Sequence, residues 1–499
     1  MAKCIMIQGT MSNVGKSLIT AGLCRIFMQD GYKTAPFKAQ NIALNSYITE
    51  EGYEMGRSQV MQAEAAGIKP SVRMNPILLK PTNDTDCQVI VNGEVWKQTS
   101  ARAYFSCKKQ LIPMVMEAYH SLEEEYDIIV IEGAGSPAEI NLKAQDTVNM
   151  GMAKAAHAPV LMVGDVDRGG VFAQLYGTVQ LLDEDEKDMV KGMIINKFRG
   201  DKTIFLPGIE KLEKIINLPA VGVVPYMTVD VDDEDSLSQR LSSGQADLID
   251  IAVIQLPHIS NFTDFNVFQG IQGVSLRYVR SLYELGIPDM IIIPGTKNTM
   301  RDLMWMRQNG LEGAVLRHAA NSTVIFGVCG GYQMLGESIS DPMRVEEGGS
   351  VEGMNLLPVS SVFQGQKTRT RVKGKFRSIG GRLHKLQGCI LEGYEIHMGE
   401  TKSSLDSITE ITDCISGESK LDGCYRGNIY GSYVHGIFDA PEIAEKVVRS
   451  LAEAKGVKLE EMPRISLMDY KNQQYDLVAD TLRKHLDMNK IYEILESGI

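Results

Sequence analysis

A glycine-rich loop near the N-terminus constrains the fold of this chain more than any other feature of its sequence. The loop, GTMSNVGKS, runs from Gly9 to Ser17, between an apolar run at 4–7 and a segment with helical spacing at 18–29. A loop between a strand and a helix directs free backbone N–H groups and the helix dipole toward one point, which suits a triphosphate. The pattern is close to G-x-x-x-x-G-K-[ST], although Thr10 replaces the first glycine.

The loop predicts which side chains meet a bound nucleotide. We expect Lys16 to contact the β and γ phosphates and the Ser17 hydroxyl to ligate Mg²⁺. Glu132 closes the run DIIVI and is well placed to hold the same ion. Asn196 ends another apolar run, where its amide can read an adenine edge. The predicted nucleotide site comprises Gly9, Thr10, Asn13, Gly15, Lys16, Ser17 and Asn196.

Short apolar runs alternate with helical spacing throughout the first half of the chain. The runs lie at 4–7, 34–37, 127–131, 160–163, 192–195 and 220–224. This alternation predicts an α/β fold in which helices join parallel strands, with ligands at the carboxyl ends of the strands. KAQNIALN at 38–45 and DVDRGG at 165–170 lie at such ends, and we interpret both as ligand-approach loops.

The pattern changes between 226 and 250, where Asp, Glu and Ser replace the apolar period. A second α/β series follows, with strands expected at 251–256, 288–294 and 323–328 and one helix over 299–320. The sequence then becomes β-like and finally helical. We expect four parts, namely a P-loop domain at 1–230, an acidic linker at 231–250, a second α/β domain at 251–445 and a helical tail at 446–499.

Charge excludes some classes of partner. The chain has 51 basic and 63 acidic residues, a net charge of −12, so no overall positive field attracts nucleic acid or an anionic membrane. No segment reaches the roughly 18 apolar residues of a membrane helix, and no signal peptide precedes the first strand. We therefore expect a cytoplasmic protein with no nucleic-acid or membrane partner. The eight cysteines include no C-x-x-C pair.

One cysteine differs from the other seven. Cys329 lies in GVCGGYQ, with glycines on both sides, between an expected strand and an expected helix. Such an elbow exposes a nucleophile at a helix N-terminus, and the dipole there favours the thiolate. The catalytic base is expected to be His435, with His397 in GYEIHMG as the competing candidate. Backbone donors at Gly295 and Gly330 would form the oxyanion hole.

These motifs carry two resemblances. The N-terminal loop is similar to the variant loop of dethiobiotin synthetases, which are ATP-dependent enzymes that activate carboxylates. The second half resembles class I glutamine amidotransferases, whose elbow cysteine forms a glutamyl thioester and releases ammonia. In most of these enzymes Pro-Glu follows the histidine, whereas here Gly436 and Ile437 follow His435. Another group must therefore orient the base, or it acts in a dyad.

Along the whole chain, the sequence resembles the cobyric acid synthases, a family of cobalamin-pathway amidotransferases. The matching motifs are GTMSNVGKS, KAQNIALNS, GRSQVMQAEAA, IEGAGSPAEINL, DVDRGGVFA, INKFRGD, PGTKNT, GVCGGYQMLG, GYEIHMG and SYVHGIFD. The resemblance implies ATP- and glutamine-dependent amidation of the b, d, e and g carboxylates of adenosylcobyrinic acid a,c-diamide. ATP, Mg²⁺, glutamine and a corrinoid polycarboxylate are the implied ligands. The cations suggested to contact the corrinoid are Arg57, Arg168, Lys197 and Arg199.

Two alternatives remain open from the sequence. The sister enzyme cobyrinic acid a,c-diamide synthase shares both modules, although KAQNIALNS and the extended C-terminal tail favour cobyric acid synthase. A partitioning-type P-loop ATPase with a binding module accounts for the first half of the chain but not for the Cys329 elbow. The sequence leaves the oligomeric state open.

Overall fold

The structure is a computed structural model that describes all residues except 1, 83–84, 232–246 and 459–466. Most of the expected acidic linker at 231–250 therefore lies outside the described residues. The chain divides into two compact units, which differ from the expected domains in two places. The first unit comprises Met1–Ala43, Met55–Glu234 and Lys471–Ile499, and the second comprises Leu44–Glu54 and Asp235–Tyr470.

A six-stranded parallel sheet forms the centre of the first unit, and the order of its strands is β12-β11-β10-β1-β9-β2. All six strands coincide with apolar runs predicted from the sequence. Because helices cover a parallel sheet on both faces, its strands are apolar almost without interruption. The strands are β1 (Lys3–Gly9), β2 (Thr34–Phe37), β9 (Ile128–Glu132), β10 (Val160–Asp165), β11 (Val190–Phe198) and β12 (Ala220–Pro225).

Helices connect these strands, and a smaller sheet lies beside them. The helices include α1 (Lys16–Gln29), α2 (Arg57–Ala65), α3 (Ala101–Cys107), α4 (Ile112–Glu123), α5 (Met150–Ala156), α6 (Val171–Gln180), α7 (Glu184–Lys187) and α8 (Lys202–Ile216). The smaller sheet has the order β3-β6-β7-β8. Its strands are β3 (Gln40–Ile42), β6 (Ile77–Pro81), β7 (Asp86–Val91) and β8 (Glu94–Ser100).

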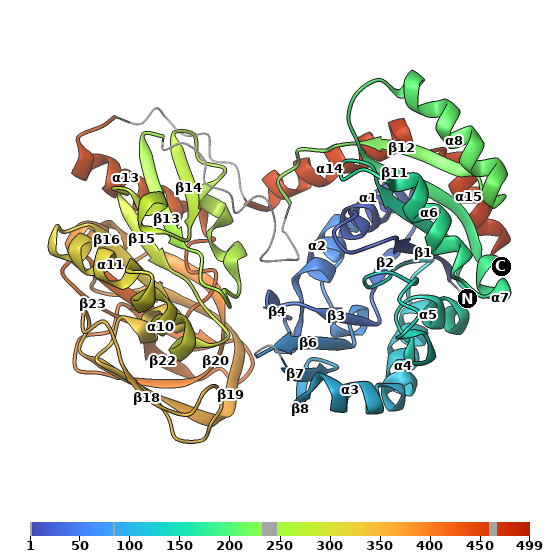
Figure 1. The fold of residues 1–499 in the computed structure, drawn as a ribbon. Coiled ribbons are helices and arrows are strands. Elements are labelled where there is room, and N and C mark those ends of the chain that lie inside the picture. The colour runs from blue at the N-terminus through green and yellow to red at the C-terminus, as the bar shows by residue number, and fades with distance from the viewer. Residues whose placement is uncertain (1, 83–84, 232–246, 459–466) are drawn as a thin grey trace. The chain divides into compact units, whose positions relative to one another are not determined.

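The last two helices return to the first unit. In Figure 1, α14 (Leu467–His485) and α15 (Met488–Ser497) lie beside the N-terminal elements of that unit. Val478 and Leu482 of α14 share a buried core with Ile19 of α1. The tail expected at 446–499 is thus divided, because α13 (Pro441–Lys455) belongs to the second unit.

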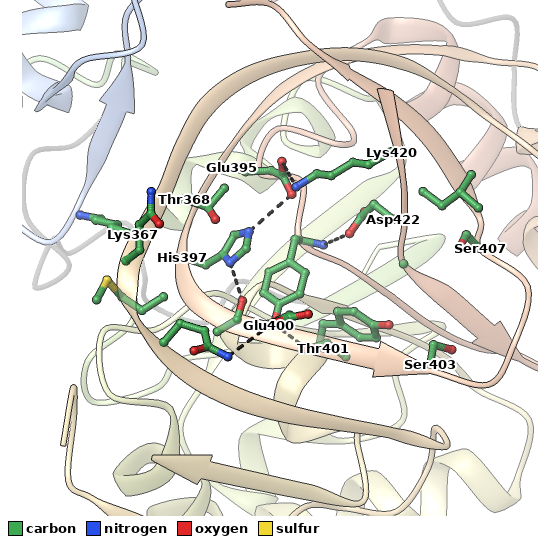
Figure 2. Close-up of a pocket in the computed structure, with 18 of the residues that line it drawn as sticks. Lys367, Thr368, Glu395, His397, Glu400, Thr401, Ser403, Ser407, Lys420 and Asp422 are labelled. Carbon is green, nitrogen blue, oxygen red and sulfur yellow. Dashed lines mark hydrogen bonds and ion pairs between the residues drawn. The ribbon is translucent and has the colours of Figure 1, made fainter. Parts of the chain in front are cut away.

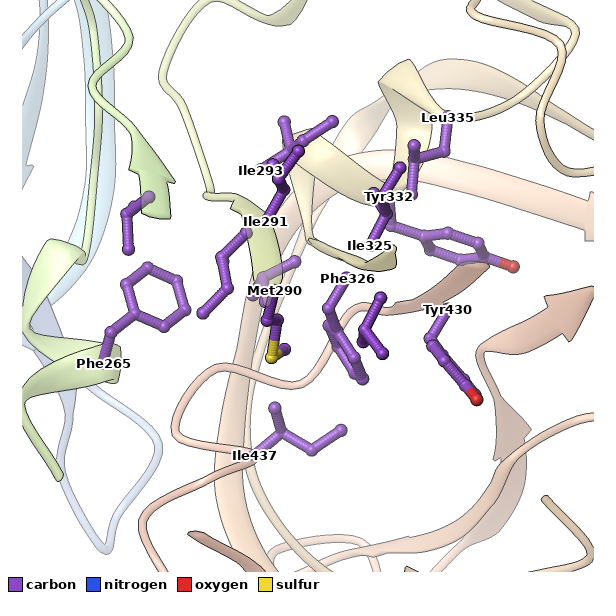
Figure 3. Packing of buried hydrophobic residues seen from close by; sticks show 14 of the residues in the cluster. Phe265, Met290, Ile291, Ile293, Ile325, Phe326, Tyr332, Leu335, Tyr430 and Ile437 are labelled. Atoms are coloured by element: carbon purple, nitrogen blue, oxygen red, sulfur yellow. The ribbon is translucent and has the colours of Figure 1, made fainter. Parts of the chain in front are cut away.

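The second unit contains another mainly parallel sheet, with the order β14-β13-β15-β16-β24-β23. Its buried side chains form one large core, in which Phe326 contacts Phe438 edge-to-face at 4.9 Å. Figure 3 shows part of this core around Ile291. The strands are β13 (Ile249–Ile254), β14 (Val274–Val279), β15 (Met290–Ile293), β16 (Val324–Val328), β23 (Cys424–Arg426) and β24 (Ile429–Ser432).

The single helix expected over 299–320 is wrong. The structure has two helices there, α10 (Thr299–Gln308) and α11 (Leu311–Ala320). Gly310 separates them with φ of +80°, a left-handed conformation that ends a helix and that glycine adopts without strain. The apolar spacing alone does not reveal this break, because both helices bury one face against the same core.

A further sheet extends the second unit, in the region where the sequence is β-like. Its long central hairpin pairs β19 (Val359–Phe376) with β20 (Ile390–Ser403), and the pairing is interrupted between Phe363 and Thr368. The other strands are β17 (Ser338–Asp341), β18 (Gly349–Glu352), β21 (Thr409–Asp413) and β22 (Ser419–Asp422). Within the described part of the chain, no helix is long and apolar enough to span a membrane.

Candidate active sites

The glycine-rich loop has the geometry expected of a phosphate site. It joins β1 to α1, and Gly15 immediately precedes the helix with φ of +97°. A methyl group at Gly15 would lie 2.3 Å from Asn196 Nδ2, so only glycine fits there. The N-cap of α1 is a glycine without a capping side chain, and the positive end of the helix dipole at this N-terminus suits an anion.

The reactive side chains of this loop point to the end of β9. The Ser17 hydroxyl donates to Glu132 Oε1 at 2.8 Å, and the Glu132 side chain is 1% exposed. Lys16 is buried too, and its ammonium group donates to the carbonyl oxygens of Met11 and Gly135 at 3.0 Å each. The structure thus brings together the three residues on which the nucleotide prediction depends.

Two residues beside Glu132 were not among the predicted contacts. Lys38 Nζ lies 3.0 Å from Glu132 Oε1 in a buried ion pair. Gln62 Nε2 donates to Glu132 Oε2 at 2.5 Å from helix α2. A buried carboxylate needs such partners because desolvation of an isolated charge is costly. The only sequence signal for Lys38 was its place in KAQNIALN, at the end of a predicted strand.

The other predicted nucleotide residues lie in or under the loop. Thr10 Oγ1 donates to Gln174 Oε1 at 3.2 Å, and Asn13 adopts φ of +61°. Asn196 is 2% exposed, and its Nδ2 donates to the Val14 carbonyl oxygen at 2.8 Å. Among the described residues, Asn196 Oδ1 is buried and has no hydrogen-bond partner. In this structure, Asn196 therefore stabilises the loop by its hydrogen bond to the Val14 backbone.

These residues fit a magnesium nucleotide. Mg²⁺ prefers hard oxygen ligands, and the Ser17 hydroxyl and the Glu132 carboxylate supply such oxygens side by side. The N-terminal end of the α1 dipole and the Lys16 ammonium group supply the matching positive charge for phosphate. The donor set thus matches both parts of the ligand.

Lys197, Arg168 and Arg199, which we suggested as contacts of the corrinoid, have acidic neighbours. Lys197 Nζ lies 2.9 Å from Asp165 Oδ2 and also donates to the Asn13 carbonyl oxygen, which ties it to the phosphate loop. Arg168 approaches the same carboxylate at 3.9 Å. Arg199 pairs with an Asp167 oxygen at 2.9 Å. The fourth, Arg57, is half-buried at the start of α2.

Cys329 occupies a strained elbow in the second unit. It lies between β16 and the short helix α12 (Gly330–Met334), with φ of +51° and ψ of −107°. This conformation is rare for a residue other than glycine and costs about 1 to 3 kcal/mol, and such strain is typical of functional sites. Cys329 is 7% exposed, and its sulfur lies 3.9 Å from the Ile396 carbonyl oxygen.

His435 lies beside this cysteine, and a carboxylate orients it. Asp264 Oδ2 is 2.6 Å from His435 Nδ1, and both side chains are buried. Burial disfavours the imidazolium, but the charge and hydrogen bond of Asp264 and the neighbouring Cys329 outweigh it. Together they raise the pKa of His435 to about 10. The structure thus places Cys329, His435 and Asp264 in the order of a catalytic triad.

Sequence reasoning missed Asp264. It lies on the 3₁₀ helix η5 (Phe262–Phe268), 171 positions before His435. No local spacing links the two residues, and only the fold brings them together. The missing glutamate after His435 was the one signal that another group had to fill this role.

The predicted oxyanion donors lie around the same elbow. A methyl group at Gly295 would come within 2.8 Å of His435 Cε1, and one at Gly330 within 3.2 Å of the Thr296 nitrogen. Two backbone segments therefore face each other next to the Cys329 thiol. This arrangement suits a developing oxyanion.

A cavity of about 890 Å³ opens beside this centre, between β19, β20 and β22. Its lining includes Glu395 and His397, which are 3.4 Å apart, and Lys420, which lies 2.8 Å from Glu395 (Figure 2). Tyr433 also lines the cavity, and its ring stacks on His397 with centroids 4.0 Å apart. His397, the competing candidate for the base, thus lies in this cavity and pairs with Glu395, whereas His435 carries the buried Asp264 contact.

Comparison with known proteins shows which family combines these two domains in one chain. A model of the CobQ/CobB/MinD/ParA nucleotide binding domain matches residues 5–238, and a model of the CobB/CobQ-like glutamine amidotransferase domain matches residues 250–443. A cobyric acid synthase from Ruminiclostridium cellulolyticum is 58% identical, with 100% of this chain and 98% of the relative covered. This chain belongs to the cobyric acid synthase family.

Other cobyric acid synthases are also similar to this chain over nearly its full length. The cobyric acid synthase of Lachnoclostridium phytofermentans is 55% identical, with both chains covered completely. That of Alkaliphilus metalliredigens is 50% identical over 98% of this chain and 99% of its own. The predicted cobyric acid synthase family, the fold class and the class of glutamine-hydrolysing amidoligase are therefore confirmed.

Proposed function

We propose that this protein uses ATP and glutamine to amidate the b, d, e and g carboxylates of adenosylcobyrinic acid a,c-diamide, giving adenosylcobyric acid. The observation that supports this proposal is a cluster of buried reactive side chains in each unit of a chain that matches cobyric acid synthases throughout. One site has the groups to hold a magnesium nucleotide, and the other has a cysteine, a histidine and a carboxylate in series.

Glutamine hydrolysis would begin at Cys329. The thiolate attacks the carboxamide carbon, and backbone N–H groups at Gly330 and the Gly295 segment stabilise the oxyanion. His435 then donates its Nε2 proton to the departing nitrogen, so that ammonia leaves and a glutamyl thioester remains. Water, deprotonated by the same imidazole, cleaves the thioester to glutamate and regenerates the thiol. Asp264 keeps the imidazole oriented and stabilises its charged form.

Carboxylate activation would take place at the loop of the first unit. An oxygen of the corrinoid carboxylate attacks the γ phosphorus of ATP, ADP leaves, and an acyl phosphate forms. Lys16 would hold the transferred phosphoryl group, and Ser17 and Glu132 would hold Mg²⁺, which neutralises charge developing on the phosphates. Ammonia then attacks the acyl carbon and phosphate departs with the former carboxylate oxygen. We assign a corrinoid-binding role to Arg57, Arg168, Lys197 and Arg199.

Replacing Asp264 by asparagine should move the alkaline limit of glutamine hydrolysis toward neutral pH. The amide keeps the shape but removes the charge that holds the pKa of His435 near 10, so burial then lowers that pKa. Hydrolysis needs the imidazolium as an acid, so activity falls as the pH rises through the pKa of His435. Glutaminase pH profiles of the two proteins test this, and identical alkaline limbs would contradict the role of Asp264.

The same ion pair makes stability depend on pH. Because the pKa of His435 in the folded protein exceeds the ordinary value near 6.5, the pair stabilises the fold fully below about pH 6.5. That contribution is lost as the pH rises toward 10. The Asp264→Asn variant should therefore lose more stability, relative to wild type, at pH 6 than at pH 10.

We assign the α-amino and α-carboxylate groups of glutamine to the cavity beside Tyr433. Glu395 offers a carboxylate for the ammonium group, and Lys420 offers an ammonium group for the carboxylate. Lys420→Ala should therefore raise the KM for glutamine about tenfold, the effect of one charge-assisted hydrogen bond, with a smaller change in kcat. Lys375→Ala is the control, because Lys375 pairs with Glu410 on the same sheet but does not line the cavity. Equal KM values in the two variants would refute the assignment.

Incubation with defined corrinoids distinguishes this reaction from its alternatives. With ATP and glutamine, the protein should consume adenosylcobyrinic acid a,c-diamide and form products in which one to four carboxyl groups have become amides, each exchange of OH for NH₂ making the product slightly lighter. Consumption of cobyrinic acid but not of its a,c-diamide would identify the sister enzyme instead. ATP hydrolysis without any glutaminase activity would favour the partitioning ATPase.

A further inference from the structure

A short segment from the N-terminal half of the sequence forms part of the amidotransferase unit. We name residues 44–54 the arm, since the chain on either side of them belongs to the first unit. The arm contains strand β4 (Ser46–Ile48) and a turn in which the Thr49 and Tyr53 backbones are hydrogen-bonded at 2.8 Å. The matched amidotransferase domain at 250–443 does not include this segment.

The arm caps the 3₁₀ helix that carries Asp264. Asn261 precedes η5 with φ of +53°, and its own side chain makes no capping bond. Instead, Asn45 Oδ1 accepts a hydrogen bond from the Phe262 N–H at 3.1 Å. In return, the Ser46 N–H donates to Asn261 Oδ1, also at 3.1 Å. Asn45, Ser46 and Asn261 are at most 2% exposed, so water does not replace these bonds easily.

A second route connects the arm to the same carboxylate. The Tyr394 hydroxyl lies 3.2 Å from Asp264 Oδ1 and 3.4 Å from the Ser46 carbonyl oxygen. The Tyr394 ring stacks on His435 with centroids 5.2 Å apart. Ile48 of the arm packs on Tyr394 in a small buried cluster. The arm therefore contacts both η5, which carries Asp264, and Tyr394, which stacks on His435.

Three further arm side chains attach the arm to the hairpin formed by β19 and β20. Glu54 pairs with Lys367 at 2.6 Å, and the Glu54 side chain is fully buried. Tyr53 lies against the Arg369 guanidinium at 5.5 Å, and Tyr47 against that of Arg371 at 5.3 Å. These contacts hold the arm along its length, which suits a precise structural role at Asp264.

We propose that Asn45 and Ser46 are positioning residues for glutamine hydrolysis, supplied to the Cys329–His435–Asp264 triad by the arm. The inference rests on the proposed function of that triad. By capping η5, Asn45 fixes the carboxylate that orients His435. The glutaminase centre thus depends on a piece of chain that lies between β3 and α2 in the sequence.

The test compares full-length Asn45→Ala with Glu51→Gln, which changes an exposed residue at the arm's turn and serves as the matched control. Asn45→Ala should lower the kcat of glutamine hydrolysis about tenfold, the effect of one buried hydrogen bond. It should also move the alkaline limb of the pH profile to lower pH, because a loosened Asp264 no longer holds the His435 proton. Amidation with ammonium should stay at the control level. Asn45→Asp, which keeps an acceptor oxygen, should restore most of the glutaminase activity.

Other outcomes overturn the inference. If Asn45→Ala and Glu51→Gln share one kcat and one alkaline limb, the arm does not position the triad. A parallel loss of ammonium-dependent amidation would show a general structural defect instead. If Asn45→Ala does not fold, Asn261→Gly replaces it, since glycine keeps the left-handed backbone and removes only the acceptor of the Ser46 N–H. Absence of glutaminase activity in the wild-type protein would refute the proposed function itself.

Discussion

Cys329→Ala is expected to abolish glutamine-dependent amidation while ammonium-dependent amidation continues. The thiol is the only group at the elbow that can form the thioester, so its loss should lower glutaminase kcat by about 10³-fold or more. The phosphate loop lies in the other unit and keeps Lys16, Ser17 and Glu132 unchanged. Corrinoid amidation, measured with saturating glutamine or with concentrated ammonium chloride, separates the two halves of the reaction.

Cys389→Ala provides a matched control for this variant. Cys389 is a buried thiol in the same unit, and its sulfur lies 3.0 Å from Lys446 Nζ. It should retain both activities. Glutamine-dependent amidation by folded Cys329→Ala, or the loss of both activities in that variant, would contradict the division of labour between the two sites.

Lys16→Ala should lose amidation with either nitrogen source. Lys16 is buried in the loop, and its ammonium group is held by two carbonyl oxygens where a γ phosphate would compete for it. Without that cation, the charge on the transferred phosphoryl group is not stabilised, and the expected loss is about 10³-fold. Two assays give the effect on carboxylate activation alone. One measures amidation with ammonium as the nitrogen source, and the other measures the release of ADP.

The control for Lys16→Ala is Lys33→Ala, which removes an exposed lysine from the same unit. It should leave both activities intact. Lys16→Ala should also retain hydrolysis of glutamine to glutamate, because Cys329 and His435 belong to the second unit. Amidation at the wild-type rate by a folded Lys16→Ala protein would mean that the loop does not activate the substrate.

The sequence predicts those parts of this fold whose local structure depends on residues that are adjacent in the chain. The six strands of the first sheet could be predicted because buried parallel strands are continuous apolar runs. The elbow at Cys329 was visible because its glycines are adjacent to it. The break at Gly310 was missed because the apolar period continues through both helices, and only the backbone conformation of one residue separates them.

Contacts between distant residues could not be predicted in this way. Asp264 reaches His435 across 171 positions, and Asn45 reaches Phe262 across 217. The last two helices pack on the first unit because Val478 and Leu482 find apolar partners there, although their sequence suggested only a helical tail. Tertiary packing determines which distant residues come into contact. A single sequence contains no local periodic pattern from which such contacts can be predicted.

The central claim is that nitrogen freed at Cys329 is joined to a carboxylate activated by ATP on the same chain. One doubly labelled reaction tests it most directly. The corrinoid carboxylates carry ¹⁸O, the glutamine amide carries ¹⁵N, and mass spectrometry measures both the amidated corrinoid and the released phosphate. The account predicts one ¹⁵N in each new amide and one ¹⁸O in each phosphate. Phosphate without ¹⁸O, or amides without ¹⁵N, would contradict it.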